Sequence, residues 1–176
     1  MIEIFLFVNP IGVACFKNEQ AIIDAIKKTE RDVKFHYVPI ANLESVRLDL
    51  VRQGIINPDL ETHNKNAQKI YNSLLDYHSI SFMGERKGRE FLYRLQVELH
   101  QRQREYSPEL TAEILETMKI NPKVFQKNRE SKYCQEAIDA DLHLAQEFDI
   151  TYTPTTIIYD YDSDDNCGVM VQGCFD

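Results

Sequence analysis

Four cysteines are the residues of this 176-residue chain with the clearest capacity for chemistry: Cys15, Cys134, Cys167 and Cys174. Disulfide exchange requires one thiolate to attack and a second thiol to resolve the mixed disulfide that results. Cys15 follows an apolar segment, residues 2–8, and a turn of sequence Asn-Pro-Ile-Gly, and a helical pattern begins close to it. The segment Gly12-Val13-Ala14-Cys15 has the spacing of a Cys-x-x-Cys pair, but glycine occupies its first position, so no dithiol can form within it.

The composition describes an acidic globular protein. The net charge of −8 argues against general binding of nucleic acid, which depends on cationic side chains that neutralise phosphates. The hydrophobic content of 43% can supply a core, and no apolar stretch approaches the roughly 18–20 residues that a membrane span needs. The N-terminus lacks a basic segment and a cleavage site, so we predict no signal peptide and a cytoplasmic location. The cysteines are then expected to be reduced, and their spacing matches no zinc site.

Two apolar segments in the first forty residues predict strands, residues 2–8 and 33–40. The first is apolar almost throughout, as in a strand that is buried on both faces of a sheet. Residues 14–29, between them, carry isoleucines on one helical face, and Glu19 is expected on the opposite face, in water. A strand, a helix and a strand of this length predict a right-handed crossover between parallel strands.

Residues 42–130 contain no convincing strand pattern and are predicted to be all-helical. Residues 42–54 are predicted to form an irregular or short helical link. Residues 85–105 are predicted to form a charged helix in which arginines and glutamates are interleaved. Such mixing is typical of an exposed face with salt bridges at i,i+4, and contact with an acidic partner is the alternative. The remaining helices are expected to start where an N-cap residue precedes a proline, at Asn57-Pro58, Ser107-Pro108 and Asn121-Pro122.

The C-terminal part returns to a sheet pattern. Residues 131–148 have an amphipathic helical pattern, and a loop that contains Thr153-Pro154 follows. Residues 155–160 and 169–173 predict two strands. The short acidic turn between them indicates an antiparallel hairpin.

The order of these elements resembles the DsbA-like branch of the thioredoxin superfamily. One local match is the strand, turn and helix start around Cys15, and the other is the run of residues 140–156, which ends in Tyr-Thr-Pro-Thr-Thr. In that family the corresponding proline is cis and faces the Cys-x-x-Cys loop. The resemblance implies a thioredoxin-like fold of the α/β class, in which residues 1–41 and 131–176 form the thioredoxin-like domain and residues 42–130 an all-helical insertion domain.

Within this branch, the opening IEIFLFVNPIGVACFKNE looks most similar to the SpxH (YjbH) group of Gram-positive bacteria. The corresponding stretch of that group reads as a strand, Asp-Pro-Leu-Cys-x-x-Cys and a helix. Here Pro10 and Cys15 match that stretch. Asn9 stands in place of its aspartate, Ile11 in place of its leucine and Gly12 in place of its first cysteine. Members of the group are cytoplasmic adapters that deliver the transcription factor Spx to the protease ClpXP. The resemblance implies protein partners of this kind, an Spx-like regulator and ClpX, and a role in regulated proteolysis during stress.

The resemblance also implies a groove that binds an extended peptide. The N–H groups at the helix start after Gly12 point outward, where they attract an anion or a carbonyl oxygen. Backbone groups beside the cis proline pair with an extended peptide, as in β-augmentation. The expected peptide-binding residues are Pro10, Gly12, Val13, Ala14, Cys15, Thr153 and Pro154. No catalytic residue, cofactor or metal is expected, and a groove without a present ligand is the alternative.

An enzyme is the second class of function that these residues allow. A thiol- or glutathione-dependent oxidoreductase or transferase would use the helix N-terminus and Cys15. Kappa-type glutathione transferases share this architecture, and they stabilise the glutathione thiolate with a serine near the first cysteine position. Gly12, Val13 and Ala14 supply no hydroxyl, which argues against a transferase. Cys15 itself is interpreted as a buried structural residue, with a redox or regulatory thiol as the alternative.

Two polar segments near the C-terminus are weaker candidates for metal sites. Asp139, His143 and Glu147 share a helix face, but a solvated polar face explains their spacing without a metal. The acidic turn has oxygen-bearing residues at the spacing of a calcium loop: Asp160, Asp162, Asp164 and Asn166. Its sixth position is Asp165 in place of glycine and its twelfth is Val171 in place of glutamate, so a charged turn is expected.

Overall fold

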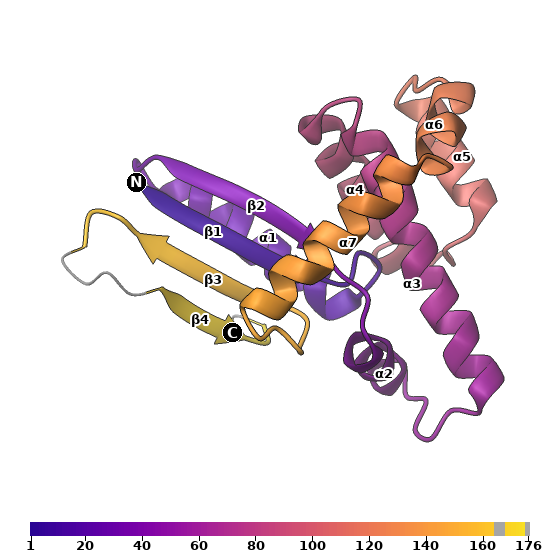
Figure 1. The fold of residues 1–176 in the computed structure, drawn as a ribbon, viewed down its shortest axis with the longest axis horizontal. Coiled ribbons are helices and arrows are strands. Elements are labelled where there is room, and N and C mark those ends of the chain that lie inside the picture. Colours follow the sequence, from indigo (N-terminus) through magenta and orange to yellow (C-terminus); the bar gives the residue numbers. More distant parts are fainter. Residues whose placement is uncertain (164–167, 175–176) are drawn as a thin grey trace.

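The sheet has four strands in the order β2-β1-β3-β4 (Figure 1). In the computed structural model, which describes residues 1–163 and 168–174, the strands are β1 (Ile2–Val8), β2 (Val33–Pro39), β3 (Thr155–Asp160) and β4 (Val169–Gln172). β1 pairs with β2 in parallel and with β3 in antiparallel, and β3 and β4 form an antiparallel hairpin. The predicted strands, the parallel first pair and the hairpin are confirmed. Cys167, Asp164 and Asn166 lie outside the described residues.

The described residues form seven helices: α1 (Val13–Lys28), α2 (Leu43–Arg52), α3 (Leu60–Ser81), α4 (Glu85–His100), α5 (Pro108–Thr117), α6 (Pro122–Arg129) and α7 (Lys132–Glu147). The side chains of Ser107 and Asn121 cap α5 and α6, and a proline follows each cap, as predicted. Every regular element between β2 and α7 is a helix, so the all-helical insertion is confirmed. Within the described parts of the chain, no helix is both long and apolar enough to span a membrane.

Two predicted helix boundaries are wrong. α3 begins two residues later than predicted because Asp59 caps it, and the Asp59 carboxylate accepts a hydrogen bond of 2.7 Å from the backbone N–H of Thr62. The predicted cap, Asn57, has a φ of 59° and belongs to the preceding turn. α4 ends at His100 and not at residue 105. Gln103, just beyond it, has a φ of 55°, a left-handed conformation that a right-handed helix does not contain.

Helices α1 and α7 cover opposite faces of the sheet (Figure 1). Side chains along β1 alternate between these faces, as they do in any strand. Ile4, Leu6 and Val8 pack with α1, and Phe7 packs in the cluster beneath α7. β1 is therefore buried on both faces, as its nearly continuous apolar sequence predicted.

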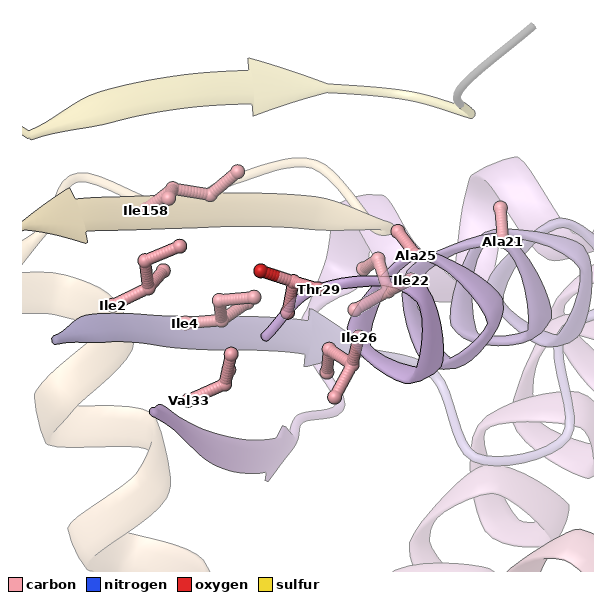
Figure 2. A pocket seen from close by; sticks show the side chains of 9 residues that line it. All are labelled: Ile2, Ile4, Ala21, Ile22, Ala25, Ile26, Thr29, Val33 and Ile158. Carbon is pink, nitrogen blue, oxygen red and sulfur yellow. The ribbon is translucent and has the colours of Figure 1, made fainter. Parts of the chain in front are cut away.

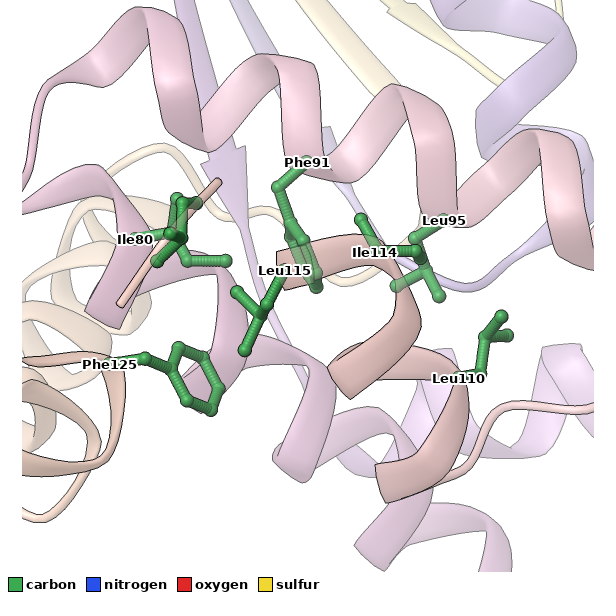
Figure 3. Packing of buried hydrophobic residues seen from close by; sticks show 8 residues of the cluster. Ile80, Phe91, Leu95, Leu110, Ile114, Leu115 and Phe125 are labelled. Atoms are coloured by element: carbon green, nitrogen blue, oxygen red, sulfur yellow. The ribbon is translucent and has the colours of Figure 1, made fainter. Parts of the chain in front are cut away.

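Helices α3–α6 bury a hydrophobic cluster of their own (Figure 3). Its buried members are Ile80, Phe91, Leu95, Leu110, Ile114, Leu115, Ile120 and Phe125. Ile11, from the turn that follows β1, packs against this cluster from outside. The turn that carries the motif is thus held at the junction between the sheet and the insertion. The division into two domains stays a prediction.

An apolar pocket of about 450 Å³ lies on the face of the sheet beside α1 (Figure 2). Aliphatic side chains of α1 and of the strands form most of its wall: Ile2, Ile4, Ala21, Ile22, Ala25, Ile26, Thr29, Val33 and Ile158. The pocket lies near the start of β1, whereas the motif follows the end of that strand. It is therefore separate from the site described below.

Candidate functional site

The turn between β1 and α1 carries the Gly-x-x-Cys motif. Asn9 fixes the turn, because its side-chain Oδ1 accepts a hydrogen bond of 3.1 Å from the N–H of Ile11 and its carbonyl accepts one of 3.0 Å from the N–H of Gly12. Gly12 is the N-cap residue of α1, with φ −79° and ψ 129°, and no side chain caps the helix. The first turn also contains no acidic residue. Within the described residues, the N–H groups of Val13 and Ala14, which are exposed and half-buried, have no hydrogen-bond partner, and no acidic side chain of the first turn offsets the positive end of the helix dipole.

Cys15 is fully buried. Its Sγ accepts a hydrogen bond of 3.3 Å from the backbone N–H of Asn9. Burial raises the pKa of the Cys15 thiol to about 12, because the interior penalises the thiolate more than the hydrogen bond stabilises it. At neutral pH the thiol stays protonated and out of reach of a disulfide in solution. These are the properties of a structural cysteine and not of a nucleophile.

The loop before β3 lies against the motif. The Thr153-Pro154 peptide bond is cis, as the resemblance implied. Thr153 is fully buried, and its hydroxyl lies against the Cys15 thiol, where it lowers the pKa of that thiol slightly. The backbone N–H and C=O of Thr153 form no hydrogen bond within residues 1–163 and 168–174. Because Thr153 has no exposed surface, these backbone groups must first be uncovered before they can pair with an extended peptide.

The segment after β4 also reaches this site, which the sequence did not indicate. The N–H of Gly173 donates a hydrogen bond of 2.8 Å to the carbonyl of Pro154. The thiol of Cys174 donates one of 3.5 Å to the carbonyl of Ala14, in the first turn of α1. Cys174 is exposed, unlike Cys15. The structure therefore brings together the predicted residues from both ends of the chain and adds a second thiol at the edge of the site.

A cleft of about 370 Å³ lies between the motif turn and the insertion. Ile11 and Val13 form its motif side. The insertion supplies the other lining residues from α2, α3, the end of α4 and the segment after it: Asp49, Arg52, Gln53, Asn66, Lys69, Leu99, His100, Gln103, Arg104, Glu105 and Tyr106. Sequence reasoning missed this cleft because its residues come from four separate segments with no common spacing.

Arg52 ties α2 to the loop that contains the cis proline. Its Nη2 donates a hydrogen bond of 3.2 Å to the hydroxyl of Tyr152, and its guanidinium carbon lies 5.5 Å from the centroid of the same ring. One turn earlier, Asp49 accepts hydrogen bonds of 2.7 Å from Gln53 Nε2 and 3.0 Å from Asn66 Nδ2. Burial raises the pKa of the Asp49 carboxyl, which favours its neutral form. The cleft thus has a fixed cation beside a carboxyl whose charge is disfavoured.

Glu19, which the helical pattern placed in water, is buried with an exposed fraction of 4%. The prediction is wrong because α4 packs against the polar side of α1, which the pattern of α1 cannot reveal. Gln96 of α4 lies beside the Glu19 carboxyl, and its Nε2 donates a hydrogen bond of 3.3 Å to the carbonyl of Pro10. Burial raises the pKa of Glu19 to about 7. Gln96 therefore links the buried carboxyl and the insertion to the motif turn.

The substitution Glu19→Gln is expected to stabilise the protein at and above pH 7. The pKa of Glu19 is about 7 in the folded protein, against an ordinary value of 4.5, so as the pH rises the unfolded chain loses this proton first. Below about pH 4.5 Glu19 is protonated in both the folded and the unfolded chain and does not reduce the free energy of unfolding. As the pH rises to about 7, that free energy falls by about 3 kcal/mol, because the unfolded chain gives up this proton more readily. Urea unfolding at several pH values across this window measures the effect in the wild type and in the variant.

The control for this measurement is Glu116→Gln, which alters an exposed glutamate on α5 and should keep the pH dependence of the wild type. A residual slope is expected even in Glu19→Gln, because burial also raises the pKa of Asp49 and of Asp141. The assignment to Glu19 fails if the unfolding free energy of Glu19→Gln falls across the window as steeply as that of the wild type.

The side chains of the two weaker candidate metal sites form hydrogen bonds and ion pairs with other residues. His143 and Glu147 form an exposed ion pair at 3.6 Å, and Asp139 accepts a hydrogen bond from Gln135. Asp160 and Asp162 both bind the guanidinium of Arg31. Within residues 1–163 and 168–174, no cluster of histidine, cysteine, aspartate or glutamate is arranged to hold a metal ion.

Comparison with known proteins gives relatives over almost the whole chain. The family model described as Thioredoxin matches residues 5–176. The chain is 22% identical to the ClpXP adapter protein SpxH of Staphylococcus saprophyticus, over 99% of this chain and 61% of that protein. It is also 22% identical to SpxH of Staphylococcus aureus, over 99% of this chain and 60% of that protein. The chain therefore spans only about 60% of the length of these curated relatives.

Solved structures share the same architecture. The oxidoreductase DsbA from Xylella fastidiosa superposes with a TM-score of 0.63 at 13% identity, over 97% of this chain and 76% of that one. The catalytic domain of Proteus mirabilis ScsC gives a TM-score of 0.63 at 12% identity, over 100% of this chain and 77% of that one. At such identities the likeness shows the fold alone. With the family match and the order of the elements, it establishes that the chain belongs to the thioredoxin family and has a DsbA-like fold, with a helical insertion in a thioredoxin-like sheet.

Proposed function

We propose that this chain is a redox-inactive, cytoplasmic adapter that binds a polypeptide in the groove between Gly12 and Thr153 and presents an Spx-type regulator to ClpXP. One observation carries the proposal: the Gly-x-x-Cys motif offers no accessible nucleophile and lies beside backbone groups that lack a hydrogen-bond partner among the described residues. Gly12 has no side chain, Cys15 is fully buried, and the backbone of Thr153 is unpaired within the described residues. The adapter role named for the SpxH relatives supports the same function.

The groove offers three kinds of contact to an extended segment. Once uncovered, the N–H and C=O of Thr153 can pair with the segment as one more strand. Val13, 38% exposed in the first turn of α1, offers an apolar contact, and the N–H groups of that turn offer hydrogen bonds. None of these contacts forms or breaks a covalent bond. The segment is therefore released unchanged, which suits a protein that hands its cargo to a protease.

A thiol- or glutathione-dependent enzyme is the second candidate, and the DsbA-like fold of the solved relatives favours it. Such an enzyme would need a thiolate at the helix start. The Cys15 thiol has no exposed surface and a pKa of about 12, which argues against this role. An insulin-reduction assay on the wild type distinguishes the two candidates, and we expect no activity above the uncatalysed rate.

The substitution Val13→Glu is expected to weaken binding of an Spx-type regulator by roughly tenfold, since it replaces an apolar contact with a charge at the centre of the groove. The helix itself should tolerate the change, because an acidic residue in the first turn interacts favourably with the helix dipole. Isothermal titration calorimetry with the purified regulator measures the affinity. Val124→Glu is the matched control, since Val124 is 41% exposed and lies in the first turn of α6, away from the groove.

A degradation assay tests delivery separately from binding. We expect the wild type to accelerate degradation of the regulator by ClpXP, and we expect Val13→Glu to accelerate it less. If the wild type neither binds the regulator nor accelerates its degradation, the proposed function is wrong. If it binds without acceleration, polypeptide binding stands and delivery to the protease is wrong.

A further inference from the structure

Two cations of the cleft beside the motif, Arg52 and Lys69, form no ion pair with any carboxylate in the described part of the chain. The other arginines of the described residues pair with acidic side chains, and only Arg52 and Arg86 do not. Arg52 is held by Tyr152 instead, through a hydrogen bond and through contact with the ring. Lys69, which also lines the cleft, forms no ion pair with any residue that the structure describes. Both cations are therefore available to a ligand.

The described acidic residues near the cleft form no ion pair with these two cations. Asp49 accepts hydrogen bonds from two amides, those of Gln53 and Asn66, and forms no ion pair with either cation. Glu98 and Glu113 are bound to Arg104, which also lines the cleft. Glu105, an exposed side chain, is the other carboxylate of the lining. Although the chain as a whole carries a net charge of −8, this cleft therefore presents two cationic side chains, Arg52 and Lys69, whose donors are not taken up by any described carboxylate.

The cleft is continuous with the proposed groove. Val13 lines the cleft and also stands in the first turn of α1, where the groove begins. Arg52 is bonded to Tyr152, the residue that precedes Thr153. A segment that reaches the Thr153 backbone would therefore pass the residue to which Arg52 is bonded. Side chains that alternate along an extended segment would point toward the cleft at every second residue.

We propose that the cleft binds carboxylate side chains of the polypeptide in the groove, with Arg52 and Lys69 as their partners, so that this protein selects acidic segments. The inference rests on the proposed function and specifies its partner: the backbone edge provides affinity for any extended chain, and the cleft provides selectivity for charge. A carboxylate gains charge-assisted hydrogen bonds from the free donors of Arg52. Contact with Tyr152 already orders the guanidinium, which reduces the entropy lost on binding.

The test is selection of short random peptides displayed on phage against the full chain. Peptides enriched by the wild type are then synthesised with a fluorescent label, and their affinities are measured by anisotropy. We expect enrichment of aspartate and glutamate, and binding that weakens as the salt concentration rises. The double variant Arg52→Gln/Lys69→Gln should bind the selected peptides roughly tenfold more weakly. Peptides with free and amidated C-termini should bind alike, since side chains are the proposed ligands.

The matched control is Arg86→Gln/Lys123→Gln. It removes an arginine and a lysine that also lack ion pairs among the described residues but lie outside the cleft, and it should bind as the wild type does. Three results would overturn the inference and leave polypeptide binding intact. They are enrichment of peptides without acidic residues, equal binding by the wild type and the Arg52/Lys69 variant, and binding that depends on a free C-terminus. If the wild type enriches no peptide above background, the inference and the proposed function both fail.

Discussion

Replacing Asp76 with alanine is expected to lower the free energy of unfolding by about 3–5 kcal/mol, because it removes one partner of a buried ion pair and leaves the other without compensation. Asp76 is 3% exposed and lies in α3. Its Oδ1 accepts a hydrogen bond of 2.7 Å from Arg129 Nε. Its Oδ2 accepts one of 2.6 Å from the Tyr106 hydroxyl and one of 2.9 Å from the Thr111 hydroxyl.

This carboxylate joins four parts of the insertion: α3, the segment before α5, α5 itself and α6. Asp76→Ala leaves a half-buried guanidinium and two hydroxyls without their acceptor, and each unpaired buried group adds a desolvation cost. Urea unfolding followed by circular dichroism measures the loss. Asp139→Ala, which truncates an exposed aspartate of α7, is the control and should change the unfolding free energy by less than about 1 kcal/mol. A loss as small as that of the control would contradict a structural role for Asp76.

Gly12→Cys is expected to give the chain a disulfide-reductase activity that the wild type lacks. A Cβ built at Gly12 lies 3.3 Å from the Sγ of Cys15, close to the separation of about 3 Å that these two atoms have across a disulfide. The backbone at Gly12 has a φ of −79°, which any residue can adopt. Asn9 Cβ and Nδ2 also lie 3.3 Å from the new Cβ, so the Asn9 side chain must shift by a few tenths of an ångström.

The new thiol would stand at the N-cap of α1, where open N–H groups and the helix dipole lower a thiol pKa. Cys15 would then act as the resolving thiol. We expect insulin reduction at least roughly tenfold faster than with the wild type, and a disulfide between residues 12 and 15 detectable by mass spectrometry after oxidation. Gly12→Ser and Gly12→Cys/Cys15→Ala are the controls, since neither can form the pair. If Gly12→Cys forms no such disulfide, the site has lost more than its first thiol.

The apolar pattern predicted most of the fold because strand burial and helix caps are local properties. The nearly continuous apolar run of β1 predicted burial on two faces, and Ser107-Pro108 and Asn121-Pro122 predicted two helix starts correctly. The wrong predictions arose where two residues compete to cap one helix, or where another helix packs against the predicted one. Asp59 displaced Asn57 as the cap of α3, and α4 buried Glu19 by packing on the polar side of α1.

The candidate site could be predicted only in part, for the same reason. The motif turn and Thr153-Pro154 carry local signals, and the structure brings them together. Arg52 and Lys69 look like ordinary surface cations of a helix in the sequence, and only the docking of α2 and α3 beside the motif places them at the cleft. Cys174 gave no signal either, because its contact with Ala14 joins residues 160 positions apart.

Binding of an Spx-type regulator to a thiol-free site is the most direct test of the central claim, that this site binds polypeptide without thiol chemistry. The measurement is calorimetric titration, in the presence of a reductant, of the wild type and of Cys15→Ala/Cys174→Ser, which removes both thiols that the structure places at the site. Circular dichroism first checks that the variant is folded. We predict the same affinity for both proteins. Binding by the wild type that is lost in the folded variant would contradict the account.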